Sequence, residues 1–458
     1  MLSALRRIAW WMGVLGLGLS AGPLCAQQVT PAEARADVEA LIETFASVHP
    51  DLYRTTSRSA IRRRVDVLER QMERPLSQRA LYVALARLAA SFDDGHTRVD
   101  LPLAAYEAAA RSGTRTFPFT VAPTDDALQV RRACSAASIP PRSHITSING
   151  RDAHVLFQTV AAAVSGAATY REAVAGDRFP WLLWAHEVEA PFRITYQRPG
   201  AAQLETVTLP GIGFARVRQC LAPDPAPPFT YQRRANVGVL TLHRMTQPHR
   251  FRRFLAQVSD RVAAHPVDGL VLDLRECRGG RTQVARLLLG ALTDDPLRLV
   301  ARKDWKVSPE YKAHLRPRVD ASYPYLEQRN GRVLSIEYDP EPVPDVPLRY
   351  RGPVTVLVGP RTFSSAVTLA ATLKAYDLAT VVGTETGGRV HRFGEGYAFR
   401  LPNSGLRAMV SSAYFVHASR PRDHDGGLVP DIAVAVPAGI GSDLTFGRAL
   451  VHLRHTSR

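Results

Sequence analysis

The spacing of apolar residues in the first part of the chain is helical. Between residues 31 and 92, apolar positions such as Val38, Leu41 and Phe45 recur every three or four residues, and Pro31 suits the first turn of a helix. A second apolar run, 81–90, ends at a polar segment that contains Asp94. We therefore expect an N-terminal helical region over residues 27–112.

The pattern then changes to short alternating runs that are typical of strands. These runs occupy residues 117–209, include the tight-turn pair Asn149-Gly150, and are interrupted by a helical stretch at 155–164. Trp181 and Trp184 are expected to be core residues. The proline-rich stretch 222–228 suits neither a helix nor a central strand. The sequence thus predicts a β-rich domain over 113–221 and a stiff linker over 222–228.

The last part of the chain, residues 229–458, shows an α/β pattern. Buried-strand runs at 237–242 and 269–274 enclose a helical run at 251–264, which is the order of a parallel pair with a crossover helix. Two further strand runs, 354–358 and 380–382, flank a helical segment at 364–376. Residues 299–349 have weak periodicity and are interpreted as an insertion or a lid.

The N-terminus has the features of a secretory signal peptide. Arg6 and Arg7 precede an apolar run at 8–19, and small residues follow up to Ala26. An uncleaved anchor is the competing interpretation, but the run is shorter than the ~20 residues of a spanning helix. We expect cleavage of residues 1–26, no stable membrane insertion of the mature chain, and a periplasmic or secreted protein.

The chain is basic, with 58 Lys and Arg against 42 Asp and Glu and a formal net charge of +16. The arginines are scattered rather than grouped in a stripe, so we expect no nucleic-acid partner. Acidic peptides, carboxylate termini or an anionic envelope surface fit this charge better. Only four residues of the chain are lysines, namely Lys303, Lys306, Lys312 and Lys374.

Three cysteines follow the signal peptide: Cys134, Cys220 and Cys277. In an oxidising compartment two of them are expected to pair, and we favour Cys134 with Cys220. Three reduced, buried cysteines are the alternative.

Three segments carry candidate chemistry. Ser364 follows a strand at the opening of a helix, where a hydroxyl could act as a nucleophile or simply cap the helix. Gly279-Gly280 follow another strand and could form an oxyanion loop or an ordinary turn. His96 lies in a loop beside Asp94, where it could serve as a general base.

In their order along the chain, these segments resemble the C-terminal processing, or tail-specific, serine peptidases, which include the tricorn core and the interphotoreceptor retinoid-binding protein relatives. The resemblance rests on Asp-Gly-His-Thr at 94–97, the loop from Asp273 to Gly280, Thr-Phe-Ser-Ser-Ala at 362–366, Thr-Gly-Gly at 386–388 and Gly-Leu-Val-Pro-Asp at 427–431. It implies a PDZ-like domain before a ClpP/crotonase-like α/β core, and hydrolysis of peptides or proteins without a cofactor. The dispersed histidines likewise indicate no metal site.

That family uses either a Ser-Lys dyad or a Ser-His pair, and the sequence favours the second. The position that resembles the dyad lysine holds Arg389, which cannot act as a base. Lys374 lies ten residues along the predicted helix from Ser364, about 15 Å away. We therefore expect Ser364 to be the nucleophile and His96 the base.

The resemblance also implies further site residues. The backbone amides of Gly279 and Ser365 would hold the oxyanion, with Gly280 as a close alternative, and Ser365 is the alternative nucleophile. The position of the family's acidic residue is occupied by His424, so Asp423 or Asp425 is the candidate to orient the site. A non-catalytic ligand-binding or peptide-binding protein and an esterase-like hydrolase are the other functions compatible with this sequence.

Overall fold

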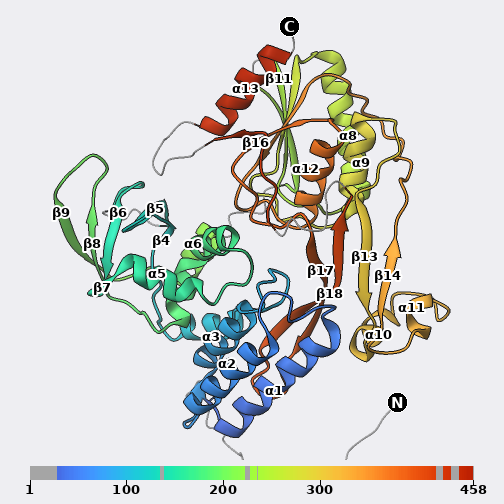
Figure 1. The fold of residues 1–458 in the computed structure, drawn as a ribbon. Helices are drawn as coiled ribbons and strands as arrows, with labels where there is room; N and C mark the ends of the chain where they lie inside the picture. Colours follow the sequence, from blue (N-terminus) through green and yellow to red (C-terminus); the bar gives the residue numbers. More distant parts are fainter. Residues whose placement is uncertain are drawn as a thin grey trace, which may run out of the picture.

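The computed structural model describes residues 28–134, 139–221, 227–234, 236–418, 426–434 and 443–456. The predicted signal peptide, most of the predicted linker, and Asp423 and Asp425 lie outside these ranges. Within them the chain is a mixed α/β protein, as expected (Figure 1).

The N-terminal part is helical, as its apolar spacing predicts. It comprises α1 (Pro31–Val48), α2 (Arg58–Gln71), α3 (Gln78–Ala90) and α4 (Leu103–Arg111), with the short strands β1 (Gln28–Val29), β2 (Leu76–Ser77) and β3 (Arg98–Val99). The first helix begins with a capping box between Thr30 and Glu33 and with Pro31 in its first turn.

These helices pack on a sheet that is built from much later residues. Its strands are β13 (Val300–Lys306), β14 (Val333–Glu337), β17 (Arg392–Arg400) and β18 (Arg407–His417), in the order β14-β13-β18-β17, and β3 pairs with β18. The short helices α10 (Pro309–Leu315) and α11 (Pro324–Glu327) lie between β13 and β14. Trp305, Tyr311 and Tyr325 share one buried cluster with α1 and α3. The segment 299–349 is thus part of a sheet that supports the N-terminal helices.

The middle part of the chain forms a separate antiparallel sheet. Its strands are β4 (Phe119–Pro123), β5 (Leu128–Ala133), β6 (His144–Ile148), β7 (Arg151–Asp152), β8 (Phe192–Gln197) and β9 (Leu204–Leu209), with α5 (Ala153–Ala161), α6 (Ala168–Ala185) and α7 (Phe214–Leu221). A disulfide between Cys134 and Cys220, with an S–S distance of 2.05 Å, joins the end of β5 to α7. The predicted pairing is therefore confirmed, and Cys277 is free and buried.

The third part is the parallel sheet that the strand-helix-strand pattern predicts. β10 (Phe229–Arg234) runs antiparallel to β11 (Val237–Leu242), and β12 (Gly269–Asp273), β15 (Val354–Val358), β16 (Thr380–Gly383) and β19 (Ile432–Ala433) follow in parallel. The crossover helix between β11 and β12 is α8 (Pro248–Ala264).

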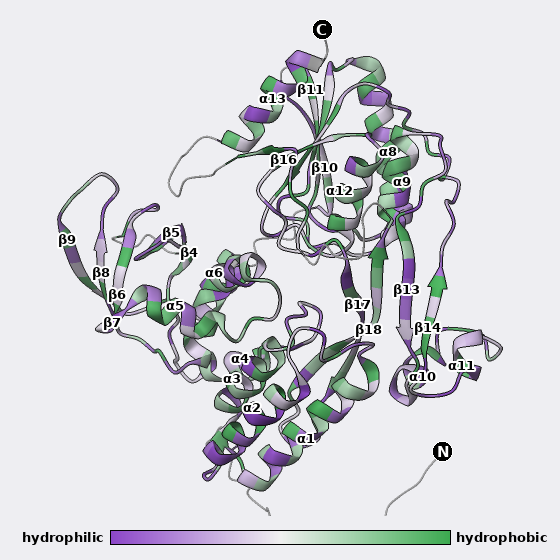
Figure 2. Ribbon diagram, in the orientation of Figure 1, coloured by the Kyte–Doolittle hydropathy of each residue, from purple (hydrophilic) through white to green (hydrophobic). Residues whose placement is uncertain are grey.

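Helices cover both faces of this sheet (Figure 1). Leu270 and Leu272 face a core that is shared with α8, α9 (Thr282–Leu292) and α12 (Ser365–Ala375), whereas Val271 faces α13 (Leu444–Thr456). The covering helix α8 carries both hydrophobic and hydrophilic residues, as an amphipathic helix does (Figure 2), whereas α12 is buried along most of its length. Among the described residues, no helix has the length and apolar character needed to span a bilayer.

Candidate active site

Ser364 lies in the turn between β15 and α12, at the carboxyl end of the parallel sheet. Its backbone has φ 57° and ψ −128°, a left-handed conformation that a residue with a side chain rarely adopts. The side chain makes no hydrogen bond that would cap α12. The structure thus does not support the interpretation of this serine as a simple helix cap.

Hydrogen bonds to the neighbouring strand loop hold this strained turn in place. Thr362 donates its hydroxyl to the Leu274 carbonyl at 2.8 Å and accepts the Gly359 amide at 3.0 Å. The Phe363 amide donates to the Cys277 carbonyl at 3.0 Å. Strain of this kind persists only where the surroundings fix the backbone, and it aims the Ser364 side chain away from the helix.

His96 meets Ser364 across 268 residues of sequence. Its Nε2 lies 3.1 Å from the Ser364 Oγ, within hydrogen-bond distance. The imidazole packs against the Phe363 ring at 4.7 Å between centroids, and Phe363 in turn stacks on Tyr170 of α6 at 4.2 Å. A base and a hydroxyl are therefore brought together with a fixed ring orientation.

Asp94 is a buried carboxylate directly behind His96. One oxygen accepts the His96 backbone amide at 2.9 Å and lies 3.6 Å from His96 Nδ1. The other oxygen accepts the hydroxyls of Thr97 and Ser411, each at 2.6 Å. Burial favours the protonated carboxyl, but the nearby imidazoles of His49 and His96 hold the pKa of Asp94 well below its usual value. Asp94 is thus an ionised group placed to orient the histidine.

His49, at the end of α1, contacts the same carboxylate from the opposite side. Its Nδ1 accepts the Asp51 amide at 3.1 Å, so the neutral ring carries its proton on Nε2, which lies 3.5 Å from Asp94. The imidazole is buried and packs on Phe393 at 4.3 Å between ring centroids. Two histidines therefore flank one buried carboxylate.

The glycine loop lies beside the strained turn. A Cβ on Gly279 would come within 2.7 Å of the Ser365 amide nitrogen and 3.0 Å of the Ser364 Cβ, and its φ is +80°. Only glycine permits so close an approach with this backbone. The predicted oxyanion residues Gly279 and Ser365 are therefore neighbours of Ser364.

The Ser365 hydroxyl is engaged elsewhere, since it donates to the Gly280 carbonyl at 2.7 Å. Ser365 is buried, whereas Ser364 is half-buried beside the histidine. The geometry thus distinguishes the two adjacent serines and favours Ser364 as the reactive one.

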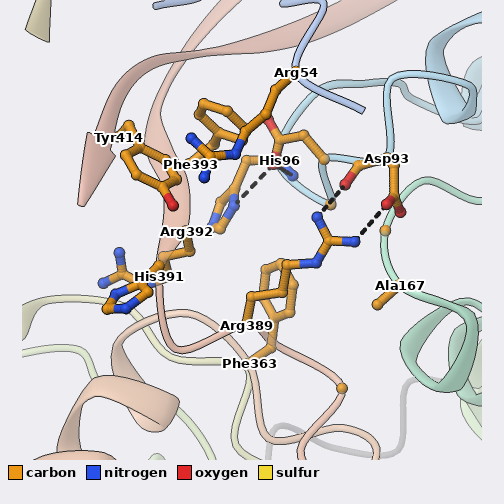
Figure 3. Close-up of a pocket in the computed structure, with 14 residues that line it drawn as sticks. Arg54, Asp93, His96, Ala167, Phe363, Arg389, His391, Arg392, Phe393 and Tyr414 are labelled. Carbon is orange, nitrogen blue, oxygen red and sulfur yellow. Dashed lines mark hydrogen bonds and ion pairs between the residues drawn. The ribbon is translucent and has the colours of Figure 1, made fainter. Parts of the chain in front are cut away.

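Arg389 and the four lysines all make contacts away from Ser364. Arg389 points to the carboxylate of Asp93, with which it forms an ion pair (Figure 3). Lys374 donates to the Val429 carbonyl at 2.9 Å and pairs with Asp431 at 2.6 Å. The other three lysines contact Glu395 and the carbonyls of Ala46 and Gln328. No lysine of the chain is therefore positioned as a base for Ser364.

A cavity of about 370 Å³ opens next to the Ser364 and His96 side chains. Its walls come from all three parts of the chain and include Tyr82, Tyr170, Arg178, Arg278 and Gly280. A second, smaller hollow, which His96 also lines, is bordered by Arg389, Phe393 and Tyr414 (Figure 3). The described residues hold no group of three or more His, Cys, Asp or Glu that could bind a metal.

Two of the predicted site residues, Asp423 and Asp425, cannot be placed because they lie outside the described ranges. Sequence reasoning missed Asp94 as an orienting residue, although it lies two positions before His96. It also did not single out His49 and Arg178, for which the sequence carries no local signal of a site, and it gave no separate role to Phe363 within the motif 362–366.

An α/β core with a strained serine, a facing histidine and a glycine loop is the architecture of a serine-type hydrolase. Residues 236–434 match the model of peptidase family S41, and this range contains Ser364. The part of the chain that contains Ser364 thus matches a family of peptidases, and the protein is a serine-type peptidase.

Two solved structures of CPAF show the same fold over most of the chain. Mature CPAF in complex with lactacystin is 16% identical, with 93% of this chain and 98% of that chain covered and a TM-score of 0.64. A mutant of CPAF is 15% identical, with 93% and 96% covered and a TM-score of 0.66. The photosystem II D1 C-terminal processing protease is 15% identical, with 92% and 97% covered and a TM-score of 0.44. A search of curated proteins found no significant match.

Proposed function

We propose that this protein is an extracytoplasmic peptidase that cleaves peptide bonds through a Ser364–His96 acyl-enzyme mechanism. The observation that carries the proposal is the 3.1 Å contact between His96 Nε2 and Ser364 Oγ, with Ser364 on a strained turn. The signal-peptide pattern of residues 1–26 and the Cys134–Cys220 disulfide support a location outside the cytoplasm.

In the first half of the reaction, His96 Nε2 accepts the proton of Ser364 as its Oγ bonds to the substrate carbonyl carbon. The negative charge on the carbonyl oxygen is held by the Ser365 amide and an amide of the Gly279-Gly280 loop. His96 then gives the proton to the leaving amine nitrogen as the C–N bond breaks. The products of this half are a free amine and an ester on Ser364.

In the second half, His96 takes a proton from a water molecule whose oxygen attacks the ester carbon. The proton returns to the Ser364 Oγ as the C–O bond breaks, and a carboxylic acid leaves. Neither half of the proposed reaction needs a metal or a cofactor.

Asp94, rather than Asp423 or Asp425, is proposed to orient the base. Its oxygen lies 3.6 Å from His96 Nδ1, a distance that is expected to shorten when the imidazolium forms. The hydroxyls of Thr97 and Ser411 fix the carboxylate from behind. An ionised carboxylate at this place holds the proton on Nδ1 and leaves Nε2 free to accept.

The middle sheet is proposed to be the PDZ-like domain, with the predicted boundaries 113–221, between an N-terminal helical region and a catalytic core over 229–458. Its position supports this assignment, because its helix α6 supplies Tyr170 and Arg178 to the wall of the cavity beside Ser364. The domain would therefore act on access to the site as well as on peptide binding.

Labelling with a fluorophosphonate tests the mechanism. Wild-type protein is expected to be labelled, Ser364→Ala to lose the label, and His96→Gln to react much more slowly. Ser365→Ala is the matched control, since its hydroxyl faces Gly280, and it is expected to keep the label. Absence of label on the wild type would favour a non-catalytic binding protein, and loss of label only in Ser365→Ala would move the nucleophile by one residue.

A further inference from the structure

Arg178 lines the cavity beside Ser364 and His96, and among the described residues no carboxylate lies within ion-pair distance of its guanidinium group. It lies on α6, whose preceding residue, Asp177, pairs with other arginines. Asp177 accepts Arg361 at 2.7 Å and Arg278 at 3.1 Å, and lies 3.5 Å from Arg131. The carboxylate next in sequence is thus already shared by three guanidinium groups.

Arg178 is half-buried, and the carboxylates near it are engaged by other arginines: Asp177 by the three named above, and Asp100, which lines a neighbouring cavity with Arg178, by Arg98. Burial, followed by the positive charges of Arg278 and Arg98, lowers its pKa from the usual arginine value. An arginine nevertheless remains protonated in proteins. Buried charges are ordinarily paired, because an unpaired ion loses its hydration without compensation. An anion that entered this cavity would restore that balance.

The geometry of the cavity limits what this anion can be. The same space of about 370 Å³ is bordered by the Ser364 nucleophile, so an occupant near Arg178 is close to the bond that is cut. A guanidinium presents parallel N–H donors that match the two oxygens of a carboxylate. Tyr82 and Tyr170 supply the remaining polar and aromatic wall.

We propose that Arg178 is a specificity-determining residue that binds a carboxylate of the substrate next to the scissile bond. This inference rests on the proposed function, since it needs Ser364 to be the nucleophile. The carboxylate belongs either to an acidic side chain or to the C-terminus of the peptide, and both present the same chemistry to the guanidinium.

Protection from fluorophosphonate labelling tests this without knowledge of the natural substrate. Three small probes are compared: N-acetyl-glutamate α-amide, which has only a side-chain carboxylate, N-acetyl-glutamine, which has only an α-carboxylate, and N-acetyl-glutamine amide, which has none. At least one carboxylate probe is expected to slow the labelling of Ser364, at concentrations about 10- to 100-fold below those at which the amide does. The probe that protects identifies the source of the carboxylate.

Variants of Arg178 show whether this residue carries the effect. Arg178→Gln is expected to react measurably with the fluorophosphonate but to lose about 10- to 100-fold of the protection by the carboxylate probe. Arg178→Lys keeps the charge without the paired donors and is expected to fall between the two. If Arg178→Gln does not fold, as shown by its melting curve, the lysine variant decides. The exposed Arg253 of α8 provides the control Arg253→Gln, which is expected to behave as wild type.

The outcomes separate the two proposals. Equal protection by the carboxylate and amide probes, or full protection in the folded Arg178 variants, would overturn the assignment of Arg178 while Ser364 stays the nucleophile. A wild-type protein that does not label at all would overturn both.

Discussion

Replacing Asp94 with asparagine is the most direct test of how the candidate base is oriented. The side chain keeps its shape but loses its charge, and one of its two oxygens becomes an NH2 group. Thr97 and Ser411 donate to one oxygen of Asp94, so the amide oxygen is expected to remain there and the NH2 group to turn toward His96, where the hydrogen bond from the His96 backbone amide is lost. That group would donate to His96 Nδ1, which places the imidazole proton on Nε2, opposite Ser364.

The size of the effect follows from this change of tautomer. A histidine with its proton on Nε2 cannot accept the Ser364 proton, and the loss for such a carboxylate-to-amide change in a triad is about 10³- to 10⁴-fold in rate. This corresponds to about 4 to 5.5 kcal/mol of transition-state stabilisation. Loss of the buried charge is also expected to lower the free energy of unfolding by about 2 kcal/mol, since hydrogen bonds to ionised groups contribute 1.5 to 3 kcal/mol each.

The assay is the second-order rate constant for fluorophosphonate labelling, with a melting curve to confirm that the variant is folded. Asp93→Asn is the matched control, because Asp93 is the adjacent carboxylate but pairs with Arg389 instead of facing His96. It is expected to stay within about tenfold of the wild type. Equal rates for a folded Asp94→Asn variant and the control would refute the orienting role and return attention to Asp423 and Asp425.

Three further predictions concern stability and the identity of the base. Replacing Cys134 and Cys220 with serine is expected to lower the free energy of unfolding by about 4 to 5 kcal/mol in the chain-entropy model, because the disulfide spans 86 residues; denaturant titration measures this, and an unchanged midpoint contradicts it. Burial, followed by the charges of His391 and Arg392, lowers the pKa of His417 to about 3. The unfolded chain therefore binds the extra proton below about pH 6.5, so stability falls by about 1.4 kcal/mol between pH 7.5 and 5.5, and His417→Gln should show a flatter melting profile over that range. Arg389→Lys is expected not to restore labelling to a His96→Ala protein, because a lysine there would also pair with Asp93; recovered labelling would reinstate a Ser-Lys dyad.

The parts of the fold that depend on local pattern could be predicted from the sequence. The hydrophobic pattern of the sequence predicts the parallel strands β11 and β12, the crossover helix α8 between them and the strand before Ser364. The structure contains all of these elements. The pairing of Cys134 with Cys220 followed from there being few cysteines to choose from. The helix α6, with Pro180 in its interior, and the strands within 299–349 carry no such pattern. Their structure depends on packing against distant parts of the chain.

Some residues of the candidate site could be predicted from the sequence and others could not. Ser364, His96 and the glycine loop lie in segments whose residue types already suggest chemistry. Asp94 gains its proposed role only because Ser411, 317 residues later, fixes the carboxylate in an orientation toward the histidine. Arg178 is noticeable only when the three-dimensional structure shows a cation in a cavity without a counterion. Contacts between residues so far apart in the chain produce no regular spacing in the sequence, so they could not be predicted from it.

The strand β18 connects the N-terminal region, which contains His96, to the rest of the fold. His96 belongs to the N-terminal region, but the adjoining strand β3 pairs with β18, and Ser411 of β18 holds Asp94. Phe363, next to the proposed nucleophile, contacts both the His96 ring and Tyr170 of α6. Ser364 thus lies beside its proposed base, His96, only while the N-terminal region, the middle sheet and the parallel core are packed together. A change that loosens this packing would separate the proposed catalytic pair without touching either residue, so we expect the packing of the three parts to be a condition for activity.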